Sequence, residues 1–301
     1  MNNNLTVLLP PEKSLPMRSK IKGIRIYYKQ FGIDLIKKFI SHELRTQKYV
    51  TGLKNILNKE KPDVLISCEF YHWYTLQALH FKKKKPELKL FVVSETKRWP
   101  ENFVARQIKK LVFWYFRINS CYVDAMLVYT EQAQQFLAVY LPQMKTILVP
   151  APIDTNLFKP TQKNTFYRNK TLKILFNARY SKYKRHDDLF SAVSQLSQRG
   201  FGIKVTCISR DDKRLFDIKC LVDKNNVKEL VHFKKSMSLE DMPALYAEND
   251  ILILPSYNEA IGMVVPEAMA CGKPTITSDT VGANVYVKDG VTGFIFKTGD
   301  I

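Results

Sequence analysis

The chain has 301 residues, of which 46% are hydrophobic and 25% are charged. These values are typical of a globular protein with about two domains, and they exclude a disordered or fibrous chain. The formal net charge is +19, and it is uneven: residues 1–165 hold 27 Lys and Arg against 12 Asp and Glu, whereas residues 166–301 hold 20 against 16. The basic first half indicates either an anionic partner or a charge that only keeps the chain in solution. Nucleic acid, a membrane surface and a phosphorylated acceptor are the alternatives for such a partner.

The positions of the cysteines, histidines and apolar runs argue against disulfide-rich, metal-binding, secreted and membrane-spanning proteins. None of the five Cys has CxxC spacing and the five His are scattered, which argues against a disulfide framework or a metal site and for a reducing compartment. Residues 1–10 do not have the pattern of a signal peptide. The most apolar stretch, residues 111–129, is interrupted by Arg117, Asn119 and Asp124, so we expect no membrane-spanning helix. We therefore expect a cytoplasmic protein without a resident metal ion.

Short apolar strands alternate with helices in the first half of the chain. The expected strands are residues 5–9, 24–28, 64–67, 88–93, 125–129 and 146–149, and the expected helices are residues 35–57, 72–82, 103–118 and 131–139. Apolar strands of four to six residues between helices are typical of a parallel sheet that is covered on both faces.

Prolines at positions 150, 152 and 160 interrupt this alternation, and a polar stretch follows at residues 161–170. We therefore expect two domains, residues 1–160 and residues 161–301. The alternation then restarts, with strands at 173–176, 203–208, 231–234, 250–254, 275–277 and 293–296 and helices at 187–198, 213–225, 239–247 and 264–270. The expected fold class is α/β with two Rossmann-like domains.

Residues 254–274, LPSYNEAIGMVVPEAMACGKP, are the most informative stretch. A strand ends at a Pro-Ser turn, a loop carries Glu259 and Gly262, and the helix that follows carries Glu267. Ligands of open α/β sheets lie beyond the carboxyl ends of the strands, and the amides of Gly262, Met263 and Val264 at a helix start favour an anion. Each residue has a simpler explanation as a turn or helix-end residue. Together they indicate a site in which two carboxylates accept hydrogen bonds from sugar hydroxyls.

This stretch resembles the Glu-x7-Glu signature of the retaining glycosyltransferases of family 4, also described as glycosyl transferases group 1. That family has the GT-B fold, in which two Rossmann-like domains face each other across a cleft. Other segments that resemble the family pattern are Ala178-Arg179 with Lys184, and residues 150–160, 245–250, 278–282 and 289–294. The resemblance covers residues 147–301, and it implies that the C-terminal domain stops short of the family's closing portion.

The resemblance implies a role for each residue of the site. Arg179 and Lys184 are expected to bind the donor diphosphate and to neutralise the leaving group, so that no metal or other cofactor is needed. Glu259 is expected to bind the hydroxyls of the donor sugar and Glu267 those of the ribose, and the amides of residues 262–264 are expected to hold sugar and phosphate. The implied reaction transfers a sugar from a UDP- or GDP-sugar to a glycan or lipid-linked acceptor, in surface polysaccharide or glycolipid synthesis.

The sequence departs from the family pattern in the linker, where Ala151-Pro152 replaces Asn-Gly, and after Leu9, where Pro10-Pro11 stands in place of a Gly-rich loop. It also lacks the glycines that flank the diphosphate-binding Arg and Lys of the family. Here Ala178 precedes Arg179, and Arg185 follows Lys184. On the acceptor side, Glu95 follows the strand expected at 88–93 and is the candidate residue of the first domain.

The helix expected at residues 103–118 combines four cations with several aromatic side chains. This composition fits peripheral docking on an anionic membrane surface, and an ordinary core helix with a wet edge is the alternative. The run Lys82–Lys85 is interpreted as a solvated stretch of charge.

Two other functions compete with a sugar transferase. One is a binding protein with a catalytically decayed GT-B fold, or the product of a gene fragment. The other is a nucleic-acid binder, which would account for the net charge. That alternative does not account for Glu259 and Glu267, because carboxylates in a cleft repel phosphate, and we therefore expect no nucleic-acid partner.

Overall fold

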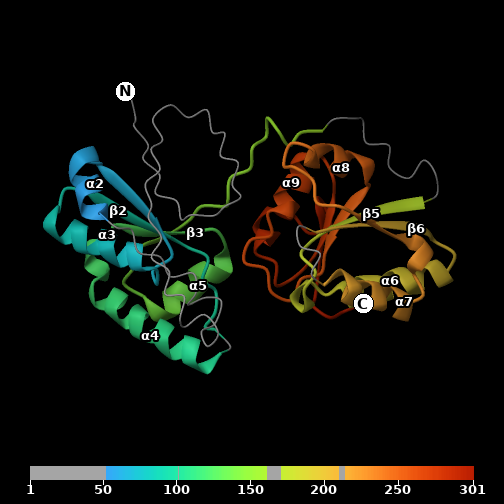
Figure 1. Ribbon diagram of the computed structural model, residues 1–301, viewed down its shortest axis with the longest axis horizontal. Helices are drawn as coiled ribbons and strands as arrows, with labels where there is room; N and C mark the ends of the chain where they lie inside the picture. Colours follow the sequence, from blue (N-terminus) through green and yellow to red (C-terminus); the bar gives the residue numbers. More distant parts are fainter. Residues whose placement is uncertain (1–51, 101, 161–170, 210–213) are drawn as a thin grey trace. The chain divides into compact units, whose positions relative to one another are not determined.

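The computed structural model describes residues 52–100, 102–160, 171–209 and 214–301 (Figure 1). The strands expected at 5–9 and 24–28 and most of the helix expected at 35–57 lie outside these residues. The chain divides into two compact units, Met1–Val149 and Pro150–Ile301. This division precedes the expected boundary at 160/161, because the segment after Val149 packs on the second unit. Phe158 is buried in that unit's core, and the Tyr286 hydroxyl donates to the Ala151 carbonyl at 2.5 Å.

The first unit contains a parallel sheet in the order β1-β2-β3-β4. Its elements are α2 (Leu53–Glu60), β1 (Val64–Cys68), α3 (Trp73–Lys84), β2 (Lys89–Ser94), α4 (Phe103–Ile118), the 3-10 turn η2 (Ser120–Tyr122), β3 (Ala125–Val128), α5 (Glu131–Tyr140) and β4 (Thr146–Leu148). Side chains of Asn102 and Thr130 accept hydrogen bonds from the first turns of α4 and α5 and fix where these helices begin. Since neighbouring strands follow one another in sequence, right-handed crossovers place α3, α4 and α5 on the same face.

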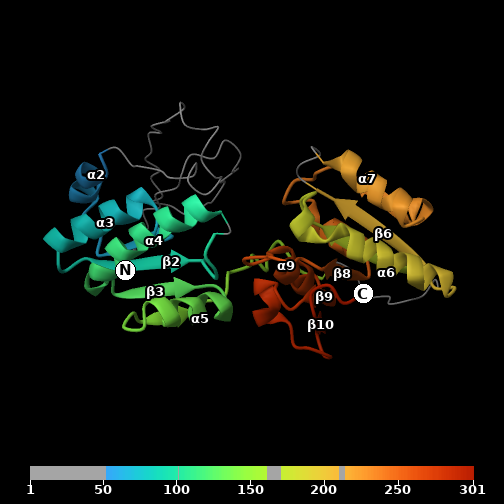
Figure 2. The same ribbon diagram turned by 90° about the horizontal axis from the view of Figure 1, so that it is seen from below.

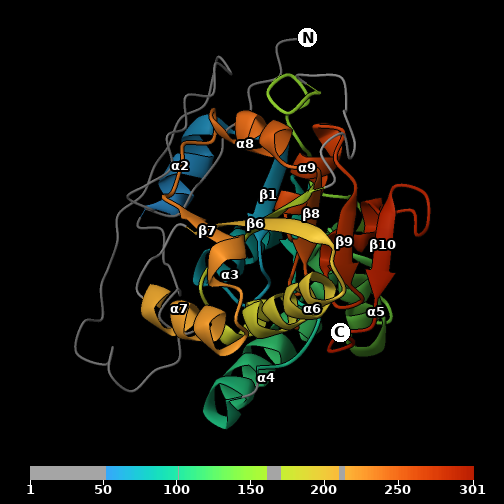
Figure 3. The ribbon, with the colours of Figure 1, turned by 90° about the vertical axis from the view of Figure 1, so that its right-hand side faces the viewer.

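The second unit contains a six-stranded parallel sheet in the order β10-β9-β8-β5-β6-β7. Its elements are β5 (Thr171–Asn177), η3 (Lys182–Lys184), α6 (His186–Gln198), β6 (Gly202–Ile208), α7 (Leu215–Lys224), η4 (Lys228–Leu230), β7 (Val231–Lys234), α8 (Met242–Glu248), β8 (Ile251–Leu254), α9 (Val264–Ala270), β9 (Thr275–Ser278), η5 (Gly282–Tyr286) and β10 (Gly293–Phe296). Helices α8 and α9 cover one face and α6 and α7 the other (Figure 1 and Figure 3). Helix α6 lies beside β6 (Figure 2), and it also contacts α7.

The strand order of the second unit reverses between β5 and β8. From β5 the chain moves outward through β6 to β7, returns to pair β8 with the other edge of β5, and then continues to β9 and β10. In a doubly wound sheet such a reversal leaves a crevice at the carboxyl ends of the two central strands, where ligands bind. The loops after β5 and β8 carry Arg179 and Glu259, so the topology places the expected site at this switch point.

Two local expectations were wrong. Helix α8 begins at Met242 and not at residue 239, because Pro243 has no amide hydrogen and is favoured in a first helical turn. Lys82 is not solvated: its side chain is buried, its ammonium donates to the carbonyls of Pro86 and Leu88, and it lies 3.5 Å from the Asp124 carboxylate. Within Lys82–Lys85, only Lys82 is buried, whereas Lys83 is partly exposed and the last two lysines are exposed.

Candidate functional site

The site of the second unit is built from the two loops that flank the switch point. Arg179 lies two residues beyond the end of β5, on the surface. Lys184 ends the 3-10 turn η3, and Glu259 lies in the loop between β8 and α9. The Tyr257 amide donates to the Tyr183 carbonyl at 2.8 Å and joins the two loops next to these residues.

Lys184 and Glu259 form an ion pair through the ammonium and one carboxylate oxygen. Their side chains are only 12% and 18% exposed, so the pair is largely shielded from water. Burial, and then the nearby guanidinium of Arg179, lower the pKa of Lys184 to about 8. Two cations and a carboxylate therefore meet at the carboxyl ends of β5 and β8.

Glu267, in the first turn of α9, is positioned by a buried tyrosine. The Tyr246 hydroxyl of α8 donates to a Glu267 carboxylate oxygen at 2.6 Å and lies 3.4 Å from the Val264 carbonyl. Burial, followed by the Glu267 carboxylate, raises the pKa of Tyr246 far above its usual value, so the hydroxyl keeps its proton and remains a donor. The sequence stretch 245–250 carried this tyrosine, but its role depends on packing between two helices.

Replacing Tyr246 with Phe tests this positioning. We expect the free energy of unfolding to fall by about 1–2 kcal/mol, since Glu267 loses a buried hydrogen bond. Urea unfolding measures this effect. The exposed Tyr257→Phe variant is the control, and equal unfolding free energies for the two variants would remove the role given to Tyr246.

Gly262 has a conformation and surroundings that suit glycine. Its φ is +83°, and an added Cβ would lie 3.0 Å from Cγ of Glu259 and 3.2 Å from side-chain atoms of Leu254 and Val281. Met263 precedes the first residue of α9, Val264, and its side chain makes no capping hydrogen bond. The amides of residues 262–264 thus stand at the start of a helix, where backbone amides lack acceptors from the preceding turn.

The loop that carries Glu259 is fixed from the neighbouring β9 loop. The hydroxyls of Ser278 and Thr280 both donate to the Ser256 carbonyl at 2.6 Å. The Gly282 amide donates to the Glu259 carbonyl at 3.1 Å. These bonds give a physical reason for the segment 278–282, and they preorganise the Glu259 backbone.

Arg185 shows why the family pattern has glycine after the lysine. Its φ is +54°, in the left-handed region that glycine adopts without strain. The Arg185 guanidinium donates to the Asp188 carboxylate at 2.7 Å, one turn into α6. Arginine therefore occupies a glycine conformation here, and a local ion pair offsets part of the strain.

Glu95 belongs to the first unit, where it directly follows β2. Its amide donates to Glu69, the residue after β1, at 2.7 Å, and the Ser94 and Thr96 hydroxyls donate to the same carboxylate at 3.0 Å. Burial and then the Glu69 carboxylate raise the pKa of Glu95. Sequence reasoning missed Glu69, although it follows its strand as Glu95 does. Two carboxyls thus share the carboxyl edge of this sheet.

In the parts of the chain that the structure describes, no three or more His, Cys, Asp or Glu side chains are grouped as ligands of a metal ion. None of the helices in those parts combines the length and apolar character that crossing a bilayer requires.

Known proteins resemble the second unit most clearly. The family model described as "Glycosyl transferases group 1" matches residues 159–301. The D-inositol 3-phosphate glycosyltransferase of Mycobacterium sp. (strain KMS) is 28% identical over 189 residues, which cover 59% of this chain and 42% of that protein. The protein of the same name from Salinispora tropica is 39% identical over 74 residues, 25% of this chain and 15% of the relative. The chain thus spans less than half the length of these curated relatives.

Solved structures resemble a larger part of the chain. Sucrose-phosphate synthase from Thermosynechococcus elongatus aligns with a TM-score of 0.65 at 19% identity, over 82% of this chain and 63% of that one. Anabaena HepE, solved in complex with UDP and glucose, aligns with a TM-score of 0.63 at 16% identity, over 92% and 73%. These likenesses confirm the expected fold class, two Rossmann-like domains of the GT-B type. Residues 159–301 of this chain are thus similar to the family glycosyl transferases group 1.

Proposed function

We propose that the protein transfers a sugar from a nucleotide diphosphate donor to a hydroxyl acceptor, with retention of the anomeric configuration. The observation that carries the proposal is the ion pair of Lys184 and Glu259, beside Arg179, at the switch point of the second sheet. A cationic pair suits a diphosphate, and a shielded carboxylate suits sugar hydroxyls.

The proposed binding mode uses each group for one part of the donor. Arg179 and Lys184 hold the diphosphate and stabilise the negative charge that develops as it departs. Glu259 accepts hydrogen bonds from the sugar, and Glu267, oriented by Tyr246, accepts from the ribose. The amides of residues 262–264 hold the sugar and phosphate from the helix start.

In the proposed reaction the acceptor hydroxyl attacks the anomeric carbon on the face that the diphosphate leaves. A new C–O bond forms, the bond to the phosphate oxygen breaks, and the acceptor proton passes to that departing oxygen. The reaction needs no metal, because the two cations neutralise the leaving group. We therefore expect activity to persist in EDTA.

The UDP complex of a protein with the same fold supports a UDP- or GDP-sugar as the donor. We propose a glycan or lipid-linked acceptor of surface polysaccharide or glycolipid synthesis, met at the inner face of the cell membrane by a peripheral cytoplasmic protein. The excess of Lys and Arg over residues 1–165 supports the membrane location.

The test is a screen of the purified protein with UDP-, GDP- and ADP-sugars, by donor consumption and by NMR of the product anomer. With the donor that is consumed, Glu259→Gln is expected to lower kcat by about 10²–10³-fold. Glu240→Gln, at an exposed position of the same unit, is the matched control. Donor binding without turnover would favour the decayed binding protein, and an inverted product would exclude retention.

A further inference from the structure

Helix α4 is apolar on two opposite faces. One face, with Ala105, Phe113 and Phe116, is buried in the first unit. The outward face carries large apolar side chains at helical spacing, with exposed fractions of 70% for Leu111 and 62% for Trp114. We call this outward set the α4 stripe; its members are Val104, Ile108, Leu111, Trp114, Tyr115 and Ile118. Contiguous exposed apolar side chains of this kind mark an interaction surface.

The four cations of α4 differ in their surroundings. Arg106 donates to the Pro100 carbonyl at 2.9 Å, and the Lys109 ammonium lies 4.1 Å from the centroid of the Tyr71 ring. Lys110 and Arg117 are exposed beside the α4 stripe, and neither pairs with an acid of the described residues. Helix α4 contains no Asp or Glu at all. The charged side chains of α4 itself are therefore all cations.

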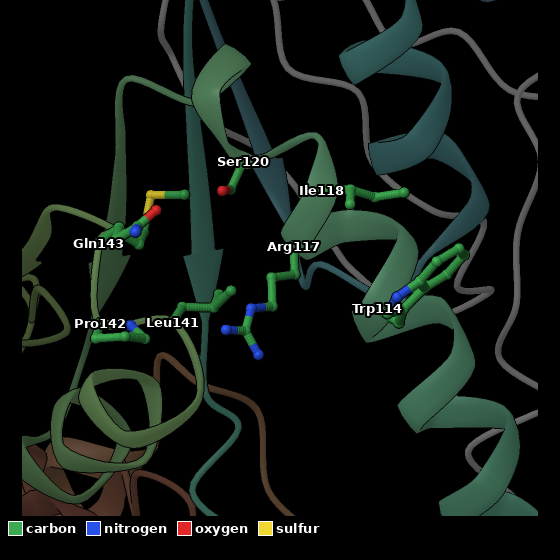
Figure 4. Close-up of a pocket in the computed structure, with 8 residues that line it drawn as sticks. Trp114, Arg117, Ile118, Ser120, Leu141, Pro142 and Gln143 are labelled. Carbon is green, nitrogen blue, oxygen red and sulfur yellow. The ribbon is translucent and has the colours of Figure 1, made fainter.

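A pocket opens at the carboxyl end of the α4 stripe. The Arg117 side chain extends from the last turn of α4 toward Leu141 and Pro142, between Trp114 and the segment 141–144 (Figure 4). The volume of this pocket is about 290 Å³, which is at the small end for ligand pockets. A pocket of this size suits a phosphate-bearing head group rather than a whole substrate. No acidic residue lines it.

The end of α3 adds charge to the same region. Turn η2 contacts both α3 and α4, and the Lys83 ammonium lies 5.1 Å from the centroid of the Tyr122 ring of that turn. Cations from two helices thus gather near the carboxyl end of the stripe.

We propose that the α4 stripe docks on an anionic lipid bilayer, with its apolar side chains in the interfacial region and with Lys110 and Arg117 on lipid phosphates. Aromatic and aliphatic side chains on a helix whose charged residues are all cations match this interface. A second copy of the chain fits less well, because a symmetric contact would bring the same cations together. Nucleic acid would use the cations and leave the apolar stripe exposed to water.

Docking along α4 has a consequence for the acceptor. The helix begins directly after the loop that follows β2, so its amino end lies at the carboxyl edge of the sheet, where Glu69 and Glu95 are held. A bilayer on the α4 stripe brings lipid-linked molecules to that edge. The docking itself does not depend on the transferase reaction, and vesicle binding is measured without a donor.

The experiment is flotation of the full chain with phosphatidylcholine vesicles and with vesicles that contain about 30% phosphatidylglycerol, about 0.1 M salt being present. We expect binding to the anionic vesicles only, with a blue shift of Trp emission that Trp114→Phe removes. Lys110→Glu with Arg117→Glu is expected to weaken partitioning by roughly tenfold or more, and Leu111→Gln with Ile108→Gln to weaken it comparably.

Matched controls lie on α7 of the second unit. Lys219→Glu reverses an exposed helical charge, and Phe216→Gln removes an apolar side chain that is 78% exposed. Both are expected to bind vesicles as the unmodified chain does, and circular dichroism shows whether each variant is folded. The proposal would be overturned if the unmodified chain did not bind vesicles, or if the α4 variants bound them as well as it does. A dimer that Leu111→Gln dissociates would also overturn it.

Discussion

Replacing Lys184 with Met is expected to lower kcat by about 10²–10³-fold and to remove the pH dependence of donor binding above pH 8. The large rate effect follows from the proposed mechanism, in which the leaving diphosphate would lose one of its two cations in a shielded site. The pH effect follows from the Lys184 pKa, which burial and Arg179 lower to about 8 in the donor-free protein.

The sign of the pH effect is fixed by the donor's charge. A bound diphosphate favours the protonated ammonium, so it raises the pKa of Lys184 above 8. Binding energy from this pair is fully present below pH 8 and is lost as the pH rises toward the raised pKa, by up to about tenfold in affinity per pH unit. Near pH 8 the complex therefore takes up a fraction of a proton.

Isothermal titration calorimetry in two buffers with different ionisation enthalpies measures this proton uptake. The Lys184→Arg variant keeps the charge without a titration near pH 8, since arginine stays protonated throughout this range. Any titration of the nucleotide affects the unmodified chain and the Lys184→Arg variant equally, so it does not contribute to the difference between their pH profiles. Equal pH profiles for the unmodified chain and the Lys184→Arg variant would contradict the assignment of the pH dependence to this lysine.

The ion pair of Lys184 and Glu259 also couples binding of the donor's diphosphate to binding of its sugar. In the structure Lys184 contacts Glu259, which is also the proposed partner of the sugar hydroxyls. A diphosphate that draws the ammonium toward itself leaves the Glu259 carboxylate to accept from the sugar. The two halves of the donor then bind cooperatively, so a nucleotide diphosphate without a sugar is a weaker ligand than the intact donor.

The sequence predicted most elements because each strand is a short apolar run with clear ends. The helices at 103–118 and 264–270 were predicted to the residue. Strand β5 extends one residue past its apolar run, to Asn177, which still pairs with Ile208 of β6. Such boundaries depend on a partner strand, and local composition does not contain that information.

The contacts of the site were less accessible to sequence reasoning. Turn η3 has no periodic apolar pattern, and it ends where Arg185 takes a left-handed conformation that favours glycine or asparagine. The pairing of Lys184 with Glu259 joins residues 75 positions apart and depends on the β5–β8 adjacency. The spacing of Glu259 and Glu267 marked their loop as the candidate site, whereas the contacts of both residues became visible only in the fold.

The first residue of β10, Gly293, offers a second large effect, on stability. Gly293→Ala is expected to lower the free energy of unfolding of the second unit by about 3 kcal/mol or more. An added Cβ would lie 2.1 Å from the Thr275 carbonyl oxygen and 3.0 Å from its hydroxyl. Thr275 is fully buried and pairs with Gly293 in the β9–β10 register, so β10 has to separate from β9.

Gly290, three residues earlier, is the matched control for Gly293. Its φ is +71°, but an added Cβ would meet nothing within 4 Å, so Gly290→Ala carries only the strain of the left-handed backbone, about 1 kcal/mol. Urea unfolding followed by far-UV circular dichroism compares the two variants. All three Trp, at positions 73, 99 and 114, lie in the first unit, so Trp emission reports that unit separately. If Gly293→Ala unfolded at the same urea concentration as Gly290→Ala, the close approach of β10 to β9 would not be what requires glycine there.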